Sequence, residues 1–213
     1  MRYYPAFLNL KNKKAVVVGG GKVAERKVRL LVKAGANVKV ISPDITKPLK
    51  KLREKSKLKH VNRNYVKRDL KNAYIVIAAT SSAEINTKIA GDSENLVNVV
   101  DTPSEGNYIV PSVVNRGPLT IAISTEGTSP AVSKTIRKEV EKHYSKEFTH
   151  YMRFLEVMRE KAVAEITDSN KRRKFLKSLA SEELIYIVRN QGFSAASEII
   201  SNRFNRVTNE KSY

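Results

Sequence analysis

The sequence of 213 residues predicts an α/β fold, with a parallel sheet flanked by helices in the first half and helices alone in the second. Two observations support this fold class. Short apolar runs, such as Ala15–Val18, Ala73–Ala79 and Leu96–Val100, are typical of strands that are covered on both faces. Segments with apolar residues at helical spacing lie between these runs, and this alternation is typical of a doubly wound sheet.

The first strand–helix–strand unit is the clearest. The run Ala15–Val18 ends at Gly19–Gly21, and Lys22–Ala34 follows without Gly or Pro. Apolar residues in this stretch recur at i, i+4, i+7 and i+8, which places them on one face of a helix. Gly35 ends the helix, and Asn37–Ile41 forms the next strand.

Further elements follow along the chain. We expect a helix around 45–52, a short strand at 58–62, a helix around 85–90, and short strands near 107–110 and 119–124. From Ser129, a good helix start before Pro130, the chain is expected to be helical, with interruptions near 168–170 and 190–193. The sequence therefore predicts three parts: a dinucleotide-binding domain over 1–112, a connecting segment over 113–145 and a small all-helical domain over 146–213.

The composition excludes several classes of protein. With 41% hydrophobic and 29% charged residues, the chain is not a disordered polycation. No apolar run reaches the about 18 residues of a membrane span and no secretion signal is recognisable, so we expect a cytoplasmic protein without a membrane partner. Cys is absent, which excludes disulfides and thiolate ligands. His143 and His150 are about 10.5 Å apart along one helix, too far to share a metal ion, so no metal site is expected.

The formal net charge of +19 is unevenly distributed. Residues 1–70 carry 20 Lys or Arg and 4 Asp or Glu, whereas residues 72–130 carry 2 and 6. Solvated basic helix faces, capture of an anionic small substrate and nucleic-acid binding would each explain the excess. Solvated faces are favoured, and no nucleic-acid partner is expected because no helix-turn-helix with a convincing recognition helix is recognisable.

A glycine motif follows the first strand. The segment Gly19–Ala24 fits G-x-G-x-x-A, the pattern that binds the pyrophosphate of a dinucleotide. Gly19 would make the tight turn, Gly21 would let the backbone approach the pyrophosphate, and Ala24 would let the helix pack on the strand. The phosphates would lie at the helix N-terminus, at Lys22. Because a strand precedes the motif and a helix follows it, dinucleotide binding is favoured over a merely structural turn.

The end of the second strand bears on the choice between NAD and NADP. An acidic residue about 20 positions after the glycines usually binds the adenosine ribose of NAD. Here Ser42 stands at the expected place, Asp44 follows two residues later, and no Arg comes next to bind a 2′-phosphate. This pattern favours NAD. Asp44 is equally well placed to cap the helix that begins near Ile45, and the two roles are compatible.

Two further polar residues follow predicted strands. Thr80 comes directly after Ala73–Ala79, and Asp101 after Leu96–Val100. Ligands of open α/β sheets lie beyond the carboxyl ends of the strands, so Thr80 is a candidate cofactor contact and Asp101 a candidate proton acceptor beside a nicotinamide. A turn before Thr102 would also explain Asp101, and the pattern alone favours that interpretation.

Beyond these local patterns, the chain resembles the precorrin-2 dehydrogenases of sirohaem biosynthesis. The segment Glu25–Lys27 after the glycines is more specific than the dinucleotide motif itself. The similar blocks occur in order along nearly the whole chain: Tyr4–Leu10, Gly19–Lys27, Ile41–Pro43, Ala78–Thr80, Asn98–Asp101, Ile109–Ser112 and Gly127–Pro130.

The resemblance implies a fold, an activity and site residues. The fold would be a Rossmann domain, a dimerisation segment over 113–145 and a helical domain, assembled as a homodimer. The activity would be the NAD-dependent oxidation of precorrin-2 to sirohydrochlorin. The family's single key Asp, after its N-V-V strand, matches Asp101. The family's cofactor contacts match Lys22, Val23, Pro43 and Asp44.

Two alternatives stay open. Some members of the family also insert Fe²⁺ into sirohydrochlorin, and nothing in the sequence decides whether this chain does. The second alternative is a non-enzymatic NAD-binding regulator that uses its basic surface on nucleic acid.

Overall fold

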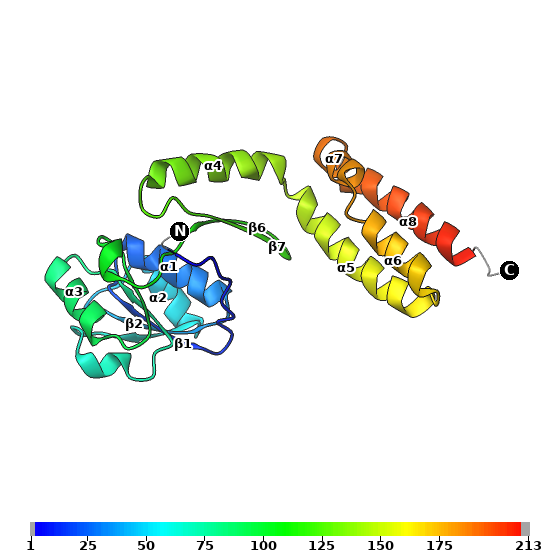
Figure 1. The fold of residues 1–213 in the computed structure, drawn as a ribbon. Helices are drawn as coiled ribbons and strands as arrows, with labels where there is room; N and C mark the ends of the chain where they lie inside the picture. Colours follow the sequence, from blue (N-terminus) through cyan, green and yellow to red (C-terminus); the bar gives the residue numbers. More distant parts are fainter. Residues whose placement is uncertain (1–2, 210–213) are drawn as a thin grey trace. The chain divides into compact units, whose positions relative to one another are not determined.

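The computed structural model of the chain describes residues 3–209 (Figure 1). The chain divides into two compact units, the first ending at Val110 and the second beginning at Pro111. Each unit has its own apolar core. In the described part of the chain, no helix is long and apolar enough to cross a membrane.

The first unit is built on a five-stranded sheet in the order β3-β2-β1-β4-β5, and every pairing is parallel. Its strands are β1 (Lys14–Val18), β2 (Asn37–Ile41), β3 (Leu58–Val61), β4 (Ile75–Ala78) and β5 (Leu96–Val99). Its helices are α1 (Lys22–Lys33), α2 (Lys47–Glu54) and α3 (Ala83–Asp92), with 3₁₀ turns η1 (Lys67–Leu70) and η2 (Pro103–Glu105). The predicted doubly wound α/β class is confirmed.

Helices cover both faces of this sheet. Along β1, Ala15 and Val17 belong to the core that includes Val28 of α1 and Leu49 of α2. Val16 and Val18 point the other way, into the core that includes Ile89 of α3. Each fully buried Val contributes about 1.5–3 kcal/mol by its removal from water. Burial on both faces explains why β1 is a continuous apolar run.

The strand register decides where the site lies. Val18 pairs with Ile41 on one side and with Ala78 on the other, and Ala78 pairs with Val99. The residues that follow these four therefore leave the sheet at one edge, its carboxyl edge. The glycine motif, the end of β2 and the segments after β4 and β5 all start there.

The second unit combines a hairpin with helices. Its elements are β6 (Ser112–Arg116), β7 (Leu119–Ile123), α4 (Pro130–His143), α5 (Glu147–Glu165), α6 (Ser169–Ser178), α7 (Glu182–Asn190) and α8 (Phe193–Asn209). The antiparallel strands β6 and β7 turn at Gly117, which has a φ of 65°. Ser129 caps α4 through its side chain, as predicted. The α5–α8 helices share one core, where the hydroxyl of Tyr151 donates to the carbonyl of Leu179 at 2.5 Å.

Some expected boundaries are wrong. No strand forms at 107–110; β6 starts at Ser112 instead. The N–H groups of Asn107 and Tyr108 both donate to the carbonyl of Val97 (3.0 and 3.4 Å), so the segment crosses the end of β5 rather than pairing along it. The helical half also has two breaks that the pattern did not predict, at 144–146 and 179–181.

Asn107 closes the free edge of β5 with its side chain. Its Oδ1 accepts from the N–H of Val97 at 2.8 Å, and its Nδ2 donates to the carbonyl of Asn95 at 2.9 Å. Together with the backbone bonds to Val97, these contacts satisfy outward-facing polar groups of β5 as a neighbouring strand would.

Candidate functional site

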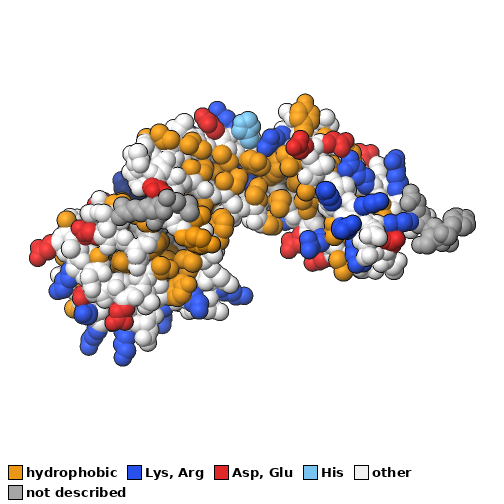
Figure 2. All heavy atoms as spheres, viewed as in Figure 1, with side chains coloured by type: hydrophobic (Ala, Val, Ile, Leu, Met, Phe, Trp, Pro, Cys, Tyr) orange, Lys and Arg blue, Asp and Glu red, His pale blue; other side chains and the backbone are white. Residues whose placement is uncertain are grey.

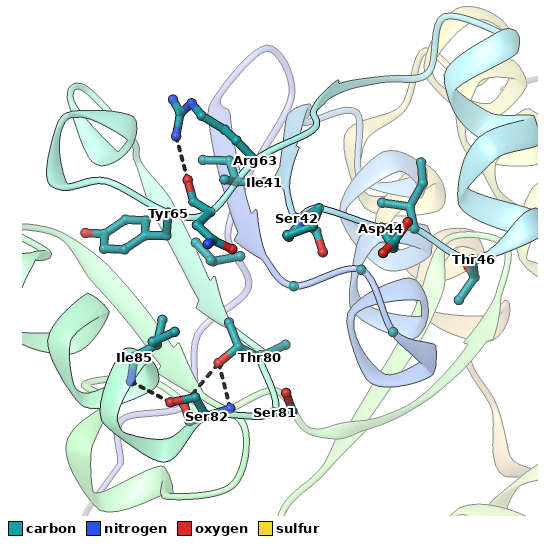
Figure 3. A pocket seen from close by; sticks show the side chains of 18 residues that line it. Ile41, Ser42, Asp44, Thr46, Arg63, Tyr65, Thr80, Ser81, Ser82 and Ile85 are labelled. Carbon is teal, nitrogen blue, oxygen red and sulfur yellow. Dashed lines mark hydrogen bonds between the residues drawn. The ribbon is translucent and has the colours of Figure 1, made fainter.

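A cavity of about 580 Å³ opens at the carboxyl edge of the sheet. Figure 3 shows its wall, with the end of β2 on one side and the segment after β4 on the other. The lining residues are Val18–Gly21, Ile41–Thr46, Arg63–Tyr65, Ala79–Ser82 and Ile85. All of them belong to the first unit.

Two of the three glycines are required by the fold. Gly19 has a φ of 119°, and a Cβ on it would lie 2.2 Å from the carbonyl oxygen of Ala79. A Cβ on Gly20 would lie 1.8 Å from the carbonyl oxygen of Asp44. The motif treats position 20 as variable, so sequence reasoning missed this requirement, which arises from a contact 24 residues away.

Gly21 is different, because a Cβ there would meet no protein atom within 4 Å. Its φ of −81° is open to any residue. The missing side chain therefore serves no contact within the chain, and it leaves space on the cavity side of the backbone. This is the geometry expected where a ligand approaches the backbone closely.

The N-terminus of α1 begins at this space. Gly21 is the N-cap and provides no side-chain acceptor, and the first helical bond runs from the Glu25 N–H to the Gly21 carbonyl at 2.9 Å. The earlier N–H groups, of Lys22 and Val23, have no intrahelical acceptor and suit an anion. Lys22 is exposed, whereas Ala24 is fully buried against the sheet and contacts the core rather than the cavity.

Glu25 fastens the glycine motif to the segment after β2. Its Oε2 accepts from the Thr46 hydroxyl at 2.8 Å and its Oε1 from Arg29 at 2.8 Å. The Thr46 N–H in turn donates to the carbonyl of Gly20 at 3.1 Å. The hydrogen bonds from Thr46 and Arg29 lower the pKa of Glu25. Glu25 of the Glu25–Lys27 segment therefore has a structural role: it holds the loop after β2 against α1.

The helix cap proposed for Asp44 is wrong. The N-cap of α2 is Thr46, whose hydroxyl accepts from the N–H of Leu49 at 3.4 Å. Asp44 is exposed on the cavity wall together with Pro43, and Ser42 lies beside them, partly buried. The carbonyl of Ser42 is held by Nε2 of His60 at 2.9 Å. His60 thus positions the segment that the sequence analysis marked for the adenosine ribose.

Thr80 lines the cavity, but its polar groups are already engaged. Its hydroxyl lies 2.8 Å from Oδ1 of Asn86 and 3.0 Å from the carbonyl of Ser82, and its N–H donates to the same Oδ1 at 3.1 Å. Asn86 is 2% exposed and also donates to the Thr80 carbonyl at 3.2 Å. Asn86 therefore shapes the loop after β4, and nothing in the sequence marked it.

Arg63 is a cavity residue that the sequence analysis missed. It follows β3 and forms a bidentate pair with Asp69, with Nη–Oδ distances of 2.8 and 2.7 Å. Asp69 is 2% exposed and also accepts from Lys39 and from the N–H of Val66. Burial alone would raise the pKa of Asp69, but the bonds from Arg63, Val66 and Lys39 outweigh burial and lower the pKa well below its usual range.

Tyr65 completes this side of the wall. Its hydroxyl donates to Oδ2 of Asp92 at 3.0 Å. Burial and the bond to Asp92 raise the pKa of Tyr65.

Asp101 does not line the cavity. It lies two residues beyond Val99, at the same carboxyl edge, and it is exposed. Among the described residues its carboxylate has no hydrogen-bond or ion-pair partner. Asn98, in the strand before it, is 5% exposed and donates to the carbonyl of Tyr108 at 3.1 Å, which fixes the chain on both sides of Asp101.

The site holds no metal cluster as far as the structure describes it. Between residues 3 and 209, no group of three or more His, Cys, Asp or Glu side chains is arranged to hold a metal ion.

The chain is similar to several known proteins. A family model described as NAD(P)-binding matches residues 6–112, and a model of the central part of sirohaem biosynthesis proteins matches residues 116–143. A siroheme synthase of Chromobacterium violaceum is 34% identical over 199 residues, which cover 92% of this chain and 42% of that protein. One of Methylobacillus flagellatus is 40% identical over 144 residues, 66% of this chain and 31% of that protein.

A solved structure is similar along its whole length. SirC, a precorrin-2 dehydrogenase, superposes with a TM-score of 0.78 and 26% identity, over 92% of this chain and 100% of SirC. The chain therefore spans less than half of the siroheme synthases that it matches and all of SirC.

The chain thus belongs to the NAD(P)-binding family that the first model describes, and its cofactor is a nicotinamide dinucleotide. The match to the second model and the similarity to siroheme synthases and to SirC define its place more narrowly. The second model describes proteins of sirohaem biosynthesis, and the similar proteins are siroheme synthases and a precorrin-2 dehydrogenase.

The different roles of the glycines can be separated by substitution. Gly21→Ala is expected to abolish dinucleotide binding with little change in stability, because its methyl group would enter the ligand's space. Gly20→Ala is expected to destabilise the fold by about 1–3 kcal/mol through overlap with the Asp44 carbonyl. Gly91→Ala in α3, where a Cβ meets no atom within 4 Å, is the control and should raise the free energy of unfolding by about 0.5–1 kcal/mol.

Urea unfolding measures the change in stability, and dinucleotide titration measures the change in affinity. Wild-type affinity in Gly21→Ala would contradict the role given to Gly21.

The Asp69 cluster predicts a pH-dependent loss of stability. Asp69→Asn is expected to lower the free energy of unfolding at pH 7 by about 1–3 kcal/mol, because Arg63 loses its buried carboxylate. Since the pKa of Asp69 is lowered in the folded protein, its contribution is complete above the unfolded-state pKa of about 3.9 and is lost as the pH falls below it.

Urea unfolding between pH 7 and pH 3 tests this expectation. The difference between wild type and Asp69→Asn should shrink toward pH 3. Asp44→Asn, at an exposed position, should show little difference at any pH. A wild type–variant difference that stays constant down to pH 3 is incompatible with a charged, stabilising Asp69.

Proposed function

We propose that the chain catalyses the NAD-dependent dehydrogenation of precorrin-2 to sirohydrochlorin, in the cytoplasm. The observation that carries the proposal is the open space at Gly21, beside the free N–H groups of α1, in a chain that matches SirC over all of SirC's length. A dinucleotide motif alone would support any NAD(P)-linked activity. The match over both units narrows the proposal to the tetrapyrrole substrate.

The residues around the cavity fit a dinucleotide. Gly21 leaves room for the pyrophosphate, and the N–H groups of Lys22 and Val23 would bind its oxygens. Ser42 to Asp44 would contact the adenosine ribose, and Thr80 would line the same pocket through its backbone and methyl group. When bound, the oxidised nicotinamide supplies a hydride acceptor.

We propose NAD rather than NADP as the cofactor. Asp44 is exposed on the cavity wall at the end of β2, near the expected ribose position. Its carboxylate would accept a hydrogen bond from a 2′-hydroxyl and would repel a 2′-phosphate.

Asp101 is proposed as the general base. Dehydrogenation removes two electrons as a hydride, which the nicotinamide takes, and one proton, which Asp101 would accept. The carboxylate leaves the sheet one strand away from the segment that carries Thr80, and within the described residues nothing competes for its oxygens. A free, exposed carboxylate at this edge is able to meet a large substrate and accept its proton.

Iron insertion into sirohydrochlorin is a second candidate activity. The unpaired carboxylate of Asp101 is suited to a passing Fe²⁺ as well as to a proton. The full-length similarity to a protein described as a dehydrogenase favours dehydrogenation as the first activity.

The proposed assembly is a homodimer, with no nucleic-acid or membrane partner. On the face shown in Figure 2, Lys and Arg side chains lie over the helices of the second unit and along the margin of the first. Precorrin-2 carries several carboxylates, so this charge would assist the capture of the substrate. Under this proposal, the net charge of +19 serves substrate capture and not nucleic-acid binding.

Spectroscopic turnover tests the activity. Purified protein with precorrin-2 and NAD should yield the absorbance of sirohydrochlorin together with NADH. Asp101→Asn is expected to lower kcat about 100-fold or more, the usual contribution of a general base. Glu94→Gln, an exposed acid before β5, is the matched control and should keep wild-type turnover. Full turnover in Asp101→Asn would reject Asp101 as the base; no turnover in wild type would reject the activity.

The role of the charge is tested by salt. Raising the NaCl concentration from about 50 to 500 mM should increase KM for precorrin-2 more than it lowers kcat, because salt screens long-range attraction. The same titration with NAD as the varied substrate controls for effects on the enzyme itself. A KM for precorrin-2 that is independent of salt would return the basic residues to a purely solvating role.

A further inference from the structure

Arg63 occupies a part of the cavity that the nucleotide motif does not explain. It follows β3, which pairs with β2 so that Val61 lies opposite Ile41. The segment that carries Arg63 therefore flanks Ser42 to Asp44, and both line the cavity, as Figure 3 shows. In this class of fold the adenosine ribose binds at the end of the second strand. Arg63 is thus at the adenosine end of the cavity, away from α1.

An arginine at the adenosine end commonly binds the 2′-phosphate of NADP. It does so through a free fork of N–H donors and an uncompensated positive charge. Here Asp69 compensates the positive charge of Arg63, and three of the five guanidinium N–H groups are already engaged. Nη1 and Nη2 of Arg63 donate to the two oxygens of Asp69 at 2.8 and 2.7 Å, and Nη1 also donates to the carbonyl of Asn64 at 2.8 Å.

The surroundings of Asp69 stabilise its pairing with Arg63. Its side chain is 2% exposed and accepts two further bonds, from Lys39 at 3.2 Å and from the Val66 N–H at 3.1 Å. Releasing Arg63 would leave a buried carboxylate with fewer donors, which is costly. The guanidinium therefore keeps one N–H of each Nη turned toward Asp69. In this orientation its flat face could stack on a neighbouring ring.

We propose that the Arg63–Asp69 pair is a specificity device for the cofactor: Arg63 forms the wall of the adenosine subsite, and Asp69 prevents it from binding a 2′-phosphate. Asp69 acts as a positioning residue, because it lies behind Arg63 and reaches the cofactor only through it. The inference rests on the proposed function, since it assumes that the cavity binds the dinucleotide. It adds a second discrimination against NADP to the one proposed for Asp44.

Direct titration of the intact protein with NADH and with NADPH, followed by cofactor fluorescence, tests the pair. Asp69→Asn removes the charge that holds Arg63, so the ratio of the NADPH to the NADH Kd should fall at least tenfold. Arg63→Leu should weaken NADH binding several-fold without improving NADPH. The double variant should lose the gain seen in Asp69→Asn.

Asp92→Asn is the matched control. Asp92 is also a partly buried carboxylate, and it accepts from Tyr65, which lines the same cavity, but it does not contact Arg63. Its substitution should leave the NADPH to NADH ratio unchanged. A folding defect would weaken both cofactors equally, so the ratio isolates specificity from stability.

Two results would overturn the proposal. An unchanged ratio in folded Asp69→Asn would mean that the pair is only structural. If Asp69→Asn does not fold, Arg63→Leu decides: unchanged NADH affinity would place Arg63 outside the subsite. The titration needs no tetrapyrrole, so a wild type that binds NADH but does not turn over precorrin-2 leaves this inference standing, and a wild type that binds neither cofactor rejects both.

Discussion

The site depends on the close approach of the glycine backbone to the ends of two neighbouring strands. The carbonyl of Ala79, after β4, and the carbonyl of Asp44, after β2, both lie where side chains at positions 19 and 20 would be. Two hydrogen bonds hold this approach on the β2 side, from the Thr46 N–H to the Gly20 carbonyl and from the Thr46 hydroxyl to Glu25. Because three segments meet within contact distance, the cavity wall and the start of α1 are fixed together.

Neighbouring residues of the glycine motif have different roles. Positions 19 and 20 serve the fold, Gly21 leaves the space for a ligand, and Glu25 keeps the next loop in place. In the proposed binding mode, the groups nearest the pyrophosphate are backbone N–H groups, whose positions depend little on rotamers. The side chains that line the cavity come from the segments after β2, β3 and β4.

Periodicity predicted the strands and the α/β class because burial on both faces leaves a long apolar signature, as in Ala15–Val18. It was wrong where a single hydrogen bond decides a boundary. Thr46, rather than Asp44, caps α2, and Asn107 turns the chain across β5 where a strand was expected. The Arg63–Asp69 pair and Asn86 could not be found from the sequence, since a polar residue in a loop shows nothing of its burial or of its partners.

The side chain of Asn107 has a consequence for assembly. A parallel sheet with an open outer strand offers unpaired N–H and carbonyl groups to any other extended chain, and such edges promote aggregation. Here the amide of Asn107 binds Val97 and Asn95 as a substitute strand would. Gly106 packs so closely on β5 that a Cβ there would lie 2.7 Å from the carbonyl oxygen of Val97. The outer margin of β5 is thereby closed to strand addition. Self-association by strand addition at that margin is therefore disfavoured.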